Sequence, residues 1–494
     1  MDWLFLDVWF MVISLVLVSI WWVIHKEIRR KKKEKEEEEM EKGIPRGSSG
    51  WPLIGETLEF IASGYTSRPV SFMDKRKAIY GKVFKTHILG KPIIVSTDAE
   101  VNKVILQNHG NVFIPSYPKS ITELLGKSSI LQMNGYLQKR VHSLIGGFLR
   151  SPHFKARITK DIQNSVQRSM STWLDQKQQI YLQDETKKIT FEVLVKVLMS
   201  IGPGEDLKFF KTEFEEFIKG LICLPIKFPG TRLYKSLKAK ERLVKKVKGI
   251  IEERKMSMDK PKDEGVTNDA VDVLLKDTDD VQGQLPLDFM SGNIIEMMIP
   301  GEETVPTATT LAVKYLSDTP AALARMVEEN MDLMKRKAES SEEYCWNDYL
   351  SLKFTQNVIS ETLRMANIIN AVWRKSLKDV KIKEHLIPKG YSVLASFSSV
   401  HMDDQNYENP YEFNPWRWEK TGSTVNIQTF TPFGGGQRLC PGLELSRLEI
   451  SIFLHHFVTK FRWVAENDEV VYFPTVRMKR KLPITIIPRL PKDH

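Results

Sequence analysis

The sequence predicts an α+β protein in which helices predominate and strands form small sheets. Apolar residues recur with helical spacing through most of residues 139–364, and capping residues separate the helices. Two shorter segments, residues 82–97 and 380–397, have strand-like patterns with Gly and Pro at turns. The chain has 494 residues, 42% of them hydrophobic, which is sufficient for a large core. Helices and strands are therefore segregated along the chain.

The N-terminus predicts a membrane anchor. Residues 8–24 contain no charged side chain, tryptophans lie toward both ends, and a basic cluster begins at Lys26. The basic residues of a cleaved signal peptide precede its apolar run, whereas Asp2 and Asp7 occupy that position here. We therefore expect residues 1–25 to form a single transmembrane signal anchor in the endoplasmic reticulum membrane, with the rest of the chain cytoplasmic.

A charged spacer is expected between this anchor and the body of the protein. Residues 26–52 begin with mixed charges and end in a hinge rich in Pro, Gly and Ser. The body is expected to span residues 53–494. Its three cysteines are far apart and odd in number, so no disulfide framework is indicated. The formal charge of +10 comes without a basic patch interleaved with aromatic residues, which argues against a nucleic acid partner.

The body contains two segments with strand patterns. Residues 82–97 predict two strands joined by a turn, and residues 98–107 predict the helix that follows them. A second sheet is expected over residues 380–397, where Pro388 and Gly390 mark a turn.

Three further segments belong to the helical part of the body. A helix near Phe209 has an apolar face and is expected to end at Pro225. Residues 259–280 are polar and charged, which predicts a loop. Residues 294–316 predict a long apolar helix that contains PGEETVP at positions 300–306. Two prolines and a glycine within a helix predict a local opening.

Glu361 and Arg364 are three residues apart, so a helix places them on one face where they can pair. Such pairs are common at protein surfaces, where they contribute little to stability. The flanking residues are apolar, which favours a buried pair that needs a further hydrogen-bond partner. Arg417, between two tryptophans, is the candidate third member of this structural triad.

The most informative segment surrounds Cys440. Three glycines precede it, which indicates a backbone that a β-carbon would obstruct, or the close approach of a flat ligand. Arg438 places a cation beside the thiol, and a helix is predicted after Gly442 with its N-terminus toward the sulfur. Both features favour the thiolate, which is the form that binds metals. The helix is too apolar for a one-sided surface helix and is expected to be buried.

Phe433, Gly436, Arg438, Cys440 and Gly442 match every fixed position of the haem-binding loop of the cytochrome P-450 monooxygenases. A lone cysteine is more often a buried structural residue, but this combination favours a haem ligand. The resemblance covers essentially the whole chain and implies the cytochrome P-450 fold. It also implies haem b as cofactor, with Cys440 as the axial thiolate ligand of its iron.

The resemblance also assigns an oxygen-activation motif on the long apolar helix. Gly301, Glu303 and Thr304 match this motif, and Glu303 and Thr304 are the implied catalytic residues. A carboxylate and a hydroxyl can relay protons during oxygen activation. Pro300 departs from the Ala or Gly that the family usually has at that position. The alternative is a kinked structural helix.

Cations for the haem propionates are a further implication of the resemblance. Arg438 is one, Arg374 is a second, and His142 occupies a position where many members have an arginine. The triad of Glu361, Arg364 and Arg417 matches a structural feature of the family.

Within the family, the chain resembles plant brassinosteroid-biosynthetic members, the steroid C-23 hydroxylases, in segments such as residues 126–130 (GKSSI) and 298–304 (MIPGEET). This implies hydroxylation of a 22-hydroxylated steroid at C-23 with O2. Oxidation at C-22 or C-3, rearrangement of peroxides without a reductase, and a membrane-bound steroid carrier are the alternatives. The residues expected to line the apolar pocket are Met297, Met298, Ile369, Val372 and Val476.

No Gly-x-Gly-x-x-Gly fingerprint for a flavin or nicotinamide follows a predicted strand, so the electrons must come from another protein. The implied partner is NADPH-cytochrome P-450 reductase. Lys139, Arg140 and Arg447 are candidate docking charges for such a partner.

Overall fold

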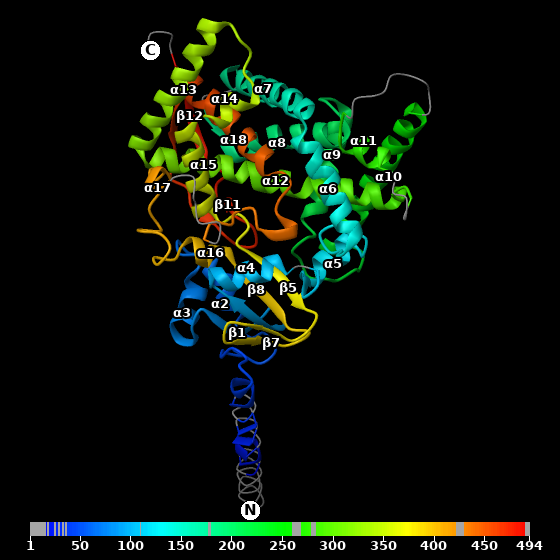
Figure 1. Ribbon diagram of the computed structural model, residues 1–494, viewed down its shortest axis with the longest axis vertical. Coiled ribbons are helices and arrows are strands. Elements are labelled where there is room, and N and C mark those ends of the chain that lie inside the picture. Colours follow the sequence, from blue (N-terminus) through cyan, green and yellow to red (C-terminus); the bar gives the residue numbers. More distant parts are fainter. Residues whose placement is uncertain are drawn as a thin grey trace, which may run out of the picture.

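A computed structural model gives the structure of residues 37–108, 110–175, 179–258, 268–277, 283–420 and 429–489, with a few positions before residue 37. A larger helical part surrounds α12 (Leu287–Asp318), and a smaller part is built around a sheet on the side where the N-terminal segment meets the body (Figure 1). The predicted fold class, α+β with helices predominating, is confirmed.

A five-stranded sheet with the order β1-β2-β8-β5-β3 forms the centre of the smaller part. β1 (Val83–Ile88) and β2 (Lys91–Ser96) pair antiparallel, which confirms the first predicted pair of strands. β8 (Ser392–Ser396) pairs parallel with β2 and antiparallel with β5 (Ala371–Ser376). β3 (Phe113–Pro115) adds to β5 at the far edge.

The sequence predicts one separate sheet over residues 380–397. This prediction is wrong for β8, which lies in the five-stranded sheet. Only β6 (Val380–Ile382) and β7 (His385–Ile387) form a sheet of their own. In β8, residues 393–395 are all buried, because alternate side chains pack into core clusters on opposite faces of the five-stranded sheet. A strand buried on both faces belongs at the centre of a sheet.

Two small sheets are formed by strands near the C-terminus. The first has three strands, β4 (Gln179–Tyr181), β12 (Pro483–Pro488) and β9 (Phe461–Ala465), in that order. The second pairs β10 (Val470–Val471) with β11 (Arg477–Met478).

α12 is the central helix of the larger part. α8 (Leu182–Met199), α10 (Arg232–Met258), α15 (Lys353–Ala366) and α18 (Leu443–Lys460) all pack against it. This enclosure explains why most side chains of α12 are buried on every side of the helix.

α12 is helical throughout the segment where the sequence predicts an opening, so that prediction is wrong. Pro300 and Pro306 lack the amide hydrogens that would bond the carbonyls four residues earlier. Threonine hydroxyls add side-chain bonds to carbonyls nearby, such as Thr310 Oγ1 to the Pro306 carbonyl at 2.7 Å. The surrounding helices hold α12 in place despite the missing main-chain bonds.

Two other predictions of helix and loop boundaries are corrected. α9 (Glu205–Ile218) ends well before Pro225, although it buries Phe210, Phe214 and Phe217 on one face as predicted. α11 (Ala270–Lys276) lies within the segment 259–280 that was predicted as a loop. The Asp269 side chain caps this helix by accepting from the Asp272 amide at 2.9 Å.

The remaining helices complete the two parts. α4 (Ala99–Gln107) begins where the sequence predicts, because the Asp98 side chain accepts from the amides of Glu100 and Val101, both at 2.9 Å. The others are α2 (Thr57–Ser63), α3 (Ser71–Tyr80), α5 (Lys119–Leu125), α6 (Tyr136–Arg150), α7 (Pro152–Asp175), α13 (Pro320–Ser340), α14 (Trp346–Leu350), α16 (Phe397–His401) and α17 (Arg417–Lys420).

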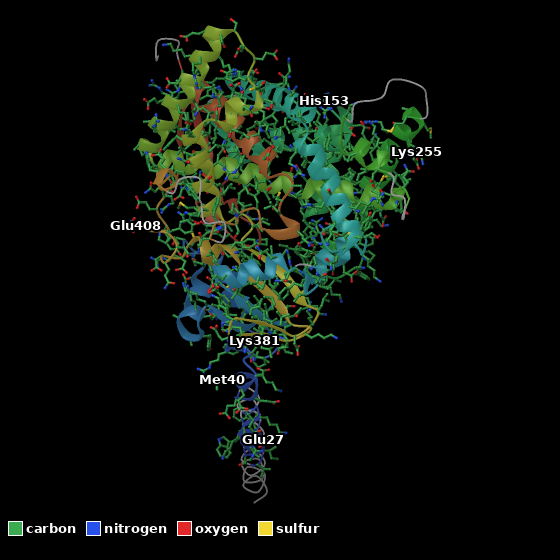
Figure 2. All side chains as sticks on the ribbon, viewed as in Figure 1. Glu27, Met40, His153, Lys255, Lys381 and Glu408 are labelled. Atoms are coloured by element: carbon green, nitrogen blue, oxygen red, sulfur yellow. The ribbon has the colours of Figure 1, made fainter. Side chains whose placement is uncertain are left out.

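The predicted anchor, residues 1–25, lies mostly outside the described residues. Among the helices that the structure does describe, none combines the length and the apolar character needed to cross a membrane. Met40 lies on the N-terminal segment, close to where this segment meets the sheet part (Figure 2). The Gly43 carbonyl accepts from the Leu386 amide at 2.8 Å, and the Arg46 carbonyl accepts from the Lys85 amide at 2.7 Å. The end of the predicted spacer therefore packs against the body.

Candidate functional site

The loop that carries Cys440 folds back on itself before a buried helix. The Cys440 amide donates to the Phe433 carbonyl at 3.1 Å, and the short 3-10 helix η1 (Gly436–Arg438) lies between these two residues. α18 begins directly after Gly442 and is buried from residue 448 to 459, as predicted. The sulfur is therefore held at the start of a helix that neighbouring elements fix on all sides.

Two of the three glycines in this loop need the conformational freedom that the sequence predicts. Gly434 and Gly436 have φ values of 75° and 63°. A β-carbon at Gly436 would lie 2.3 Å from the Leu106 carbonyl oxygen of α4. The neighbour that requires glycine at this position is therefore the backbone of α4, rather than a flat ligand.

The surroundings of the Cys440 thiol differ from those predicted. Burial raises the pKa of the thiol, and a hydrogen bond from the Gly442 amide partly offsets this effect. The Arg438 guanidinium is bound elsewhere, with its Nη1 donating to the carbonyls of Ile130 at 3.2 Å and Leu131 at 3.1 Å. The effect of Arg438 on the thiolate stays a prediction. The Gly442 amide favours the thiolate, and a bound iron would favour it as well.

Arg374, which is buried, and Arg438, which is partly buried, form a pair of cations close to Tyr117. Burial lowers the pKa of Arg374. Burial, together with the charge of the neighbouring Arg374, lowers the pKa of Arg438 to about 10. The Nε of Arg374 is buried without a hydrogen-bond partner among the described residues. Such a donor is costly unless something else accepts from it. Two adjacent cations, one with a spare donor, fit the two carboxylates of a haem.

The His142 side chain contacts a main-chain carbonyl of the cysteine loop. Its Nε2 donates to the Leu439 carbonyl at 2.8 Å, and this bond ties α6 to the residue before Cys440. The role predicted for His142 at a haem propionate stays a prediction.

Thr304 and Glu303 lie on the part of α12 between the two prolines. Thr304 Oγ1 donates to the Pro300 carbonyl at 2.5 Å. The hydroxyl therefore bonds across the helical turn that begins at Pro300. Both side chains are half-buried. A hydroxyl that is held by one carbonyl remains able to accept a proton from a neighbour and to donate elsewhere after rotation.

Glu302, rather than Glu303, is the deeply buried carboxyl of this segment, and sequence reasoning missed it. Its side chain is 2% exposed and lies 3.7 Å from Lys187 Nζ on α8. Burial raises its pKa to about 7, while Lys187 opposes the shift. The available signal was the position of Glu302 on the helix, next to Gly301. Gly301 faces α8 so closely that a β-carbon there would lie 2.4 Å from Leu194.

The structure brings Glu361, Arg364 and Arg417 together. Arg364 forms two parallel bonds to Glu361, from Nε at 2.9 Å and from Nη2 at 2.8 Å, and both side chains are fully buried. Arg417 Nε donates to Glu361 Oε1 at 2.9 Å. The Arg364 guanidinium also donates to the carbonyls of His401 at 2.9 Å and Pro410 at 2.8 Å. This network joins α15 to the chain that leads into α17 and the cysteine loop.

The five residues predicted to line a pocket are divided among different regions. Met297 and Met298 lie on α12, and Thr307 Oγ1 of the same helix donates to the Val476 carbonyl at 3.4 Å. Val372 lies on β5 and packs against the core of the five-stranded sheet. Ile369 is 47% exposed. The structure thus brings Val476 to α12 but leaves Ile369 near the surface.

Of the three candidate docking charges, only Lys139 is exposed. Arg447 donates to Gln356 Oε1 at 3.2 Å and to Ser360 Oγ at 3.1 Å, and burial lowers its pKa to about 10. Arg140 pairs with Asp277 at 2.6 Å with both side chains largely buried. Arg140 and Arg447 are therefore structural residues, and their prediction as docking charges is wrong.

Comparison with known proteins agrees with this geometry. The chain is 68% identical over 451 residues, covering 91% of this chain and 85% of the relative, to the 3-epi-6-deoxocathasterone 23-monooxygenase CYP90C1 of Arabidopsis thaliana. It is 54% identical over 443 residues, 90% of this chain and 89% of the relative, to a second enzyme of the same name and organism, CYP90D1. The solved structure of cyanobacterial CYP120A1 with retinoic acid bound superposes with a TM-score of 0.77 at 25% identity, covering 90% of this chain and 99% of that one. The family model described as cytochrome P450 matches residues 45–485, and the chain therefore belongs to the cytochrome P450 family.

Proposed function

We propose that this protein is a haem-thiolate monooxygenase that hydroxylates a steroid side chain at C-23, in 22-hydroxylated brassinosteroid precursors. The observation that carries this proposal is the high identity, over most of the chain, to two relatives named as 23-monooxygenases. The cysteine loop and the cation pair beside it support the same chemistry.

Haem with an axial thiolate supplies the activation of O2 that inserts oxygen into an unreactive C–H bond. In this chain Cys440 supplies the sulfur, and the turn from Phe433 through Gly436 to Gly442 fixes its position. Arg374 and Arg438 would hold the haem carboxylates, with His142 securing the loop between them and the sulfur. The triad of Glu361, Arg364 and Arg417 holds the main chain that leads into this loop.

Proton delivery is proposed for Thr304 and Glu303. The Thr304 hydroxyl is both donor and acceptor, and the half-buried Glu303 carboxylate adjoins it in sequence. A carboxylate with some solvent access can take protons from water, and a hydroxyl can pass them inward. Apolar side chains on α12, such as Met297 and Met298, exclude bulk water from the substrate side.

The cellular setting that we propose follows the sequence. Residues 1–25 would anchor the protein in the endoplasmic reticulum membrane, residues 26–52 would form the spacer and hinge, and residues 53–494 would form the cytoplasmic catalytic domain. NADPH-cytochrome P-450 reductase would supply the electrons. An apolar steroid substrate could enter from the lipid phase.

The test of this function is product identification. Purified protein is incubated with the reductase, NADPH and a 22-hydroxysteroid, and the product is analysed by mass spectrometry. We expect a product hydroxylated at C-23 that forms only with NADPH. Oxidation at another carbon would contradict the assigned position, product formed without NADPH would indicate peroxide rearrangement, and absence of product would favour a carrier.

Thr304→Ala is expected to uncouple NADPH consumption from product formation. Without the hydroxyl, proton delivery is slower, so product formed per NADPH should fall by roughly tenfold or more. The matched control is Thr309→Ala, which removes another hydroxyl of α12 that donates to the carbonyl four residues earlier, in this case Val305 at 2.9 Å. Coupling is measured as the ratio of hydroxylated steroid to NADPH consumed. Unchanged coupling in the Thr304 variant, or equal loss in both, would count against the relay.

A further inference from the structure

The segment 126–133, which contains the GKSSI motif, lies between α12 and the cysteine loop. Residues 128–130 bond to α12, and the carbonyls of residues 130, 131 and 133 bond to Arg438. The Ile130 amide donates to Asn293 Oδ1 on α12 at 2.7 Å. The carbonyls of Ile130 and Leu131 accept from Arg438 at 3.2 and 3.1 Å, and Met133 accepts from it as well. The segment is therefore a hydrogen-bonded bridge from α12 to the arginine of the cysteine loop.

The α12 side of this bridge is made by two buried polar residues one helical turn apart. Glu296 is 2% exposed, and its Oε2 accepts from Ser129 Oγ at 2.6 Å. Burial raises the pKa of Glu296 to about 7, while Ser129, Lys240 and the amides of Leu131 and Ile130 favour its charged form. Asn293 uses its amide nitrogen as well, donating to the Ser128 carbonyl at 3.2 Å. Polar groups in such an apolar helix are costly unless every bond is made, and here the bonds go to one segment.

The start of the 126–133 segment is held by contacts that do not involve α12. Gly126 has a φ of 84°, a conformation that favours glycine. On α10, Lys240 Nζ donates to the carbonyls of Leu124 at 3.0 Å and Leu125 at 2.6 Å, which end α5. The segment therefore starts from a fixed point, and its path from there depends on the contacts with α12.

We propose that Glu296, with Asn293 and Ser129, is a positioning residue that sets the Arg438 guanidinium for cofactor binding through the 126–133 segment. Glu296 acts through the segment and does not contact the guanidinium. Its carboxylate holds the amides of Ile130 and Leu131, which fixes the direction of the carbonyls of these two residues. Those carbonyls in turn orient the Arg438 guanidinium. The proposal rests on haem binding by this family and is independent of which steroid is the substrate.

Glu296→Gln tests the proposal with little change in side-chain shape. The amide keeps one acceptor for Ser129 but turns an N–H donor toward the main-chain N–H donors, which cannot pair with it. The matched control is Glu449→Gln, because Glu449 is also a buried glutamate, bonded to the Thr190 hydroxyl, and burial likewise raises its pKa to about 7. Both variants are prepared as haem-loaded full-length protein.

Three measurements are made on these proteins: hydrogen exchange of the peptide covering residues 126–133, the rate of haem transfer to excess apomyoglobin, and the haem reduction potential. Glu296→Gln should accelerate exchange and haem transfer by about tenfold, the size expected when one buried hydrogen-bond partner is lost. A less firmly held cation near the haem should also lower the potential. Glu449→Gln should leave all three at wild-type values.

Faster exchange with unchanged haem transfer and potential would overturn the proposal, and so would unchanged exchange. If Glu296→Gln does not yield folded protein, Ser129→Ala provides the same test by removing only the hydroxyl. Ser129→Thr, which keeps the hydroxyl, should restore wild-type behaviour. Equal effects of Ser129→Ala and Ser129→Thr would also contradict the role assigned here.

Discussion

Replacing Cys440 by alanine is expected to abolish steroid hydroxylation. The substitution removes the axial sulfur and leaves a methyl group at the start of α18. The neighbouring Arg438 and His142 side chains donate to main-chain carbonyls, and neither supplies a sulfur in its place. A bound haem would depend on this sulfur for the electron donation that supports oxygen activation, so turnover should fall to background without it.

The Cys440 prediction is checked by product formation and by the absorbance of the reduced carbon monoxide complex, which is diagnostic for an axial thiolate. Cys345→Ala is the control, because Cys345 is an exposed cysteine. Its main-chain amide donates to Asp348 Oδ2 at 2.7 Å and its side chain accepts from the Asp348 amide, so the substitution removes one contact at the start of α14 only. That control should keep both the spectrum and the activity. Hydroxylation by the Cys440 variant at the wild-type rate would exclude Cys440 as the ligand.

The parts of this site that could be predicted are those encoded by local spacing. Cys440, the positive φ values of Gly434 and Gly436, and the buried helix after Gly442 follow from residues adjacent in sequence. The same holds for the Glu361–Arg364 pair, because one helical turn brings the two side chains together. β1, β2 and the Asp98 cap are likewise local features.

Long-range contacts decided the features that could not be predicted. The Arg438 side chain extends to carbonyls about three hundred residues earlier in the chain, and its position two residues before Cys440 gives no sign of these partners. β8 joined the first sheet because both of its faces are buried, which a pattern of a few apolar residues cannot reveal. α12 stayed helical across Pro300 and Pro306 because packing by neighbouring helices outweighed local propensity.

Glu361→Gln is expected to destabilise the whole catalytic domain. Glu361 is fully buried and accepts from Arg364, Arg417, the Trp418 indole at 3.0 Å and the Asn414 amide at 3.1 Å. A glutamine keeps the shape but loses the negative charge, and its N–H group faces donors. Removing one partner of a buried ion pair costs about 3–5 kcal/mol, because it leaves a buried charge uncompensated. Here the guanidiniums of Arg364 and Arg417 both lose the carboxylate that they share.

The control for Glu361→Gln is Glu328→Gln, which breaks another Arg–Glu pair three residues apart with the same 2.8 Å separation. Arg325 and Glu328 are 49% and 65% exposed, and such surface pairs contribute about 0–1 kcal/mol. Thermal unfolding of the haem-loaded proteins, followed by circular dichroism, should show a large fall in midpoint for Glu361→Gln and almost none for Glu328→Gln. The two pairs share the sequence spacing and the 2.8 Å separation, and they differ in burial and in the further bonds that Glu361 accepts from Arg417, Trp418 and Asn414. Equal midpoints for the two variants would mean that the buried network does not stabilise the main chain leading to the cysteine loop.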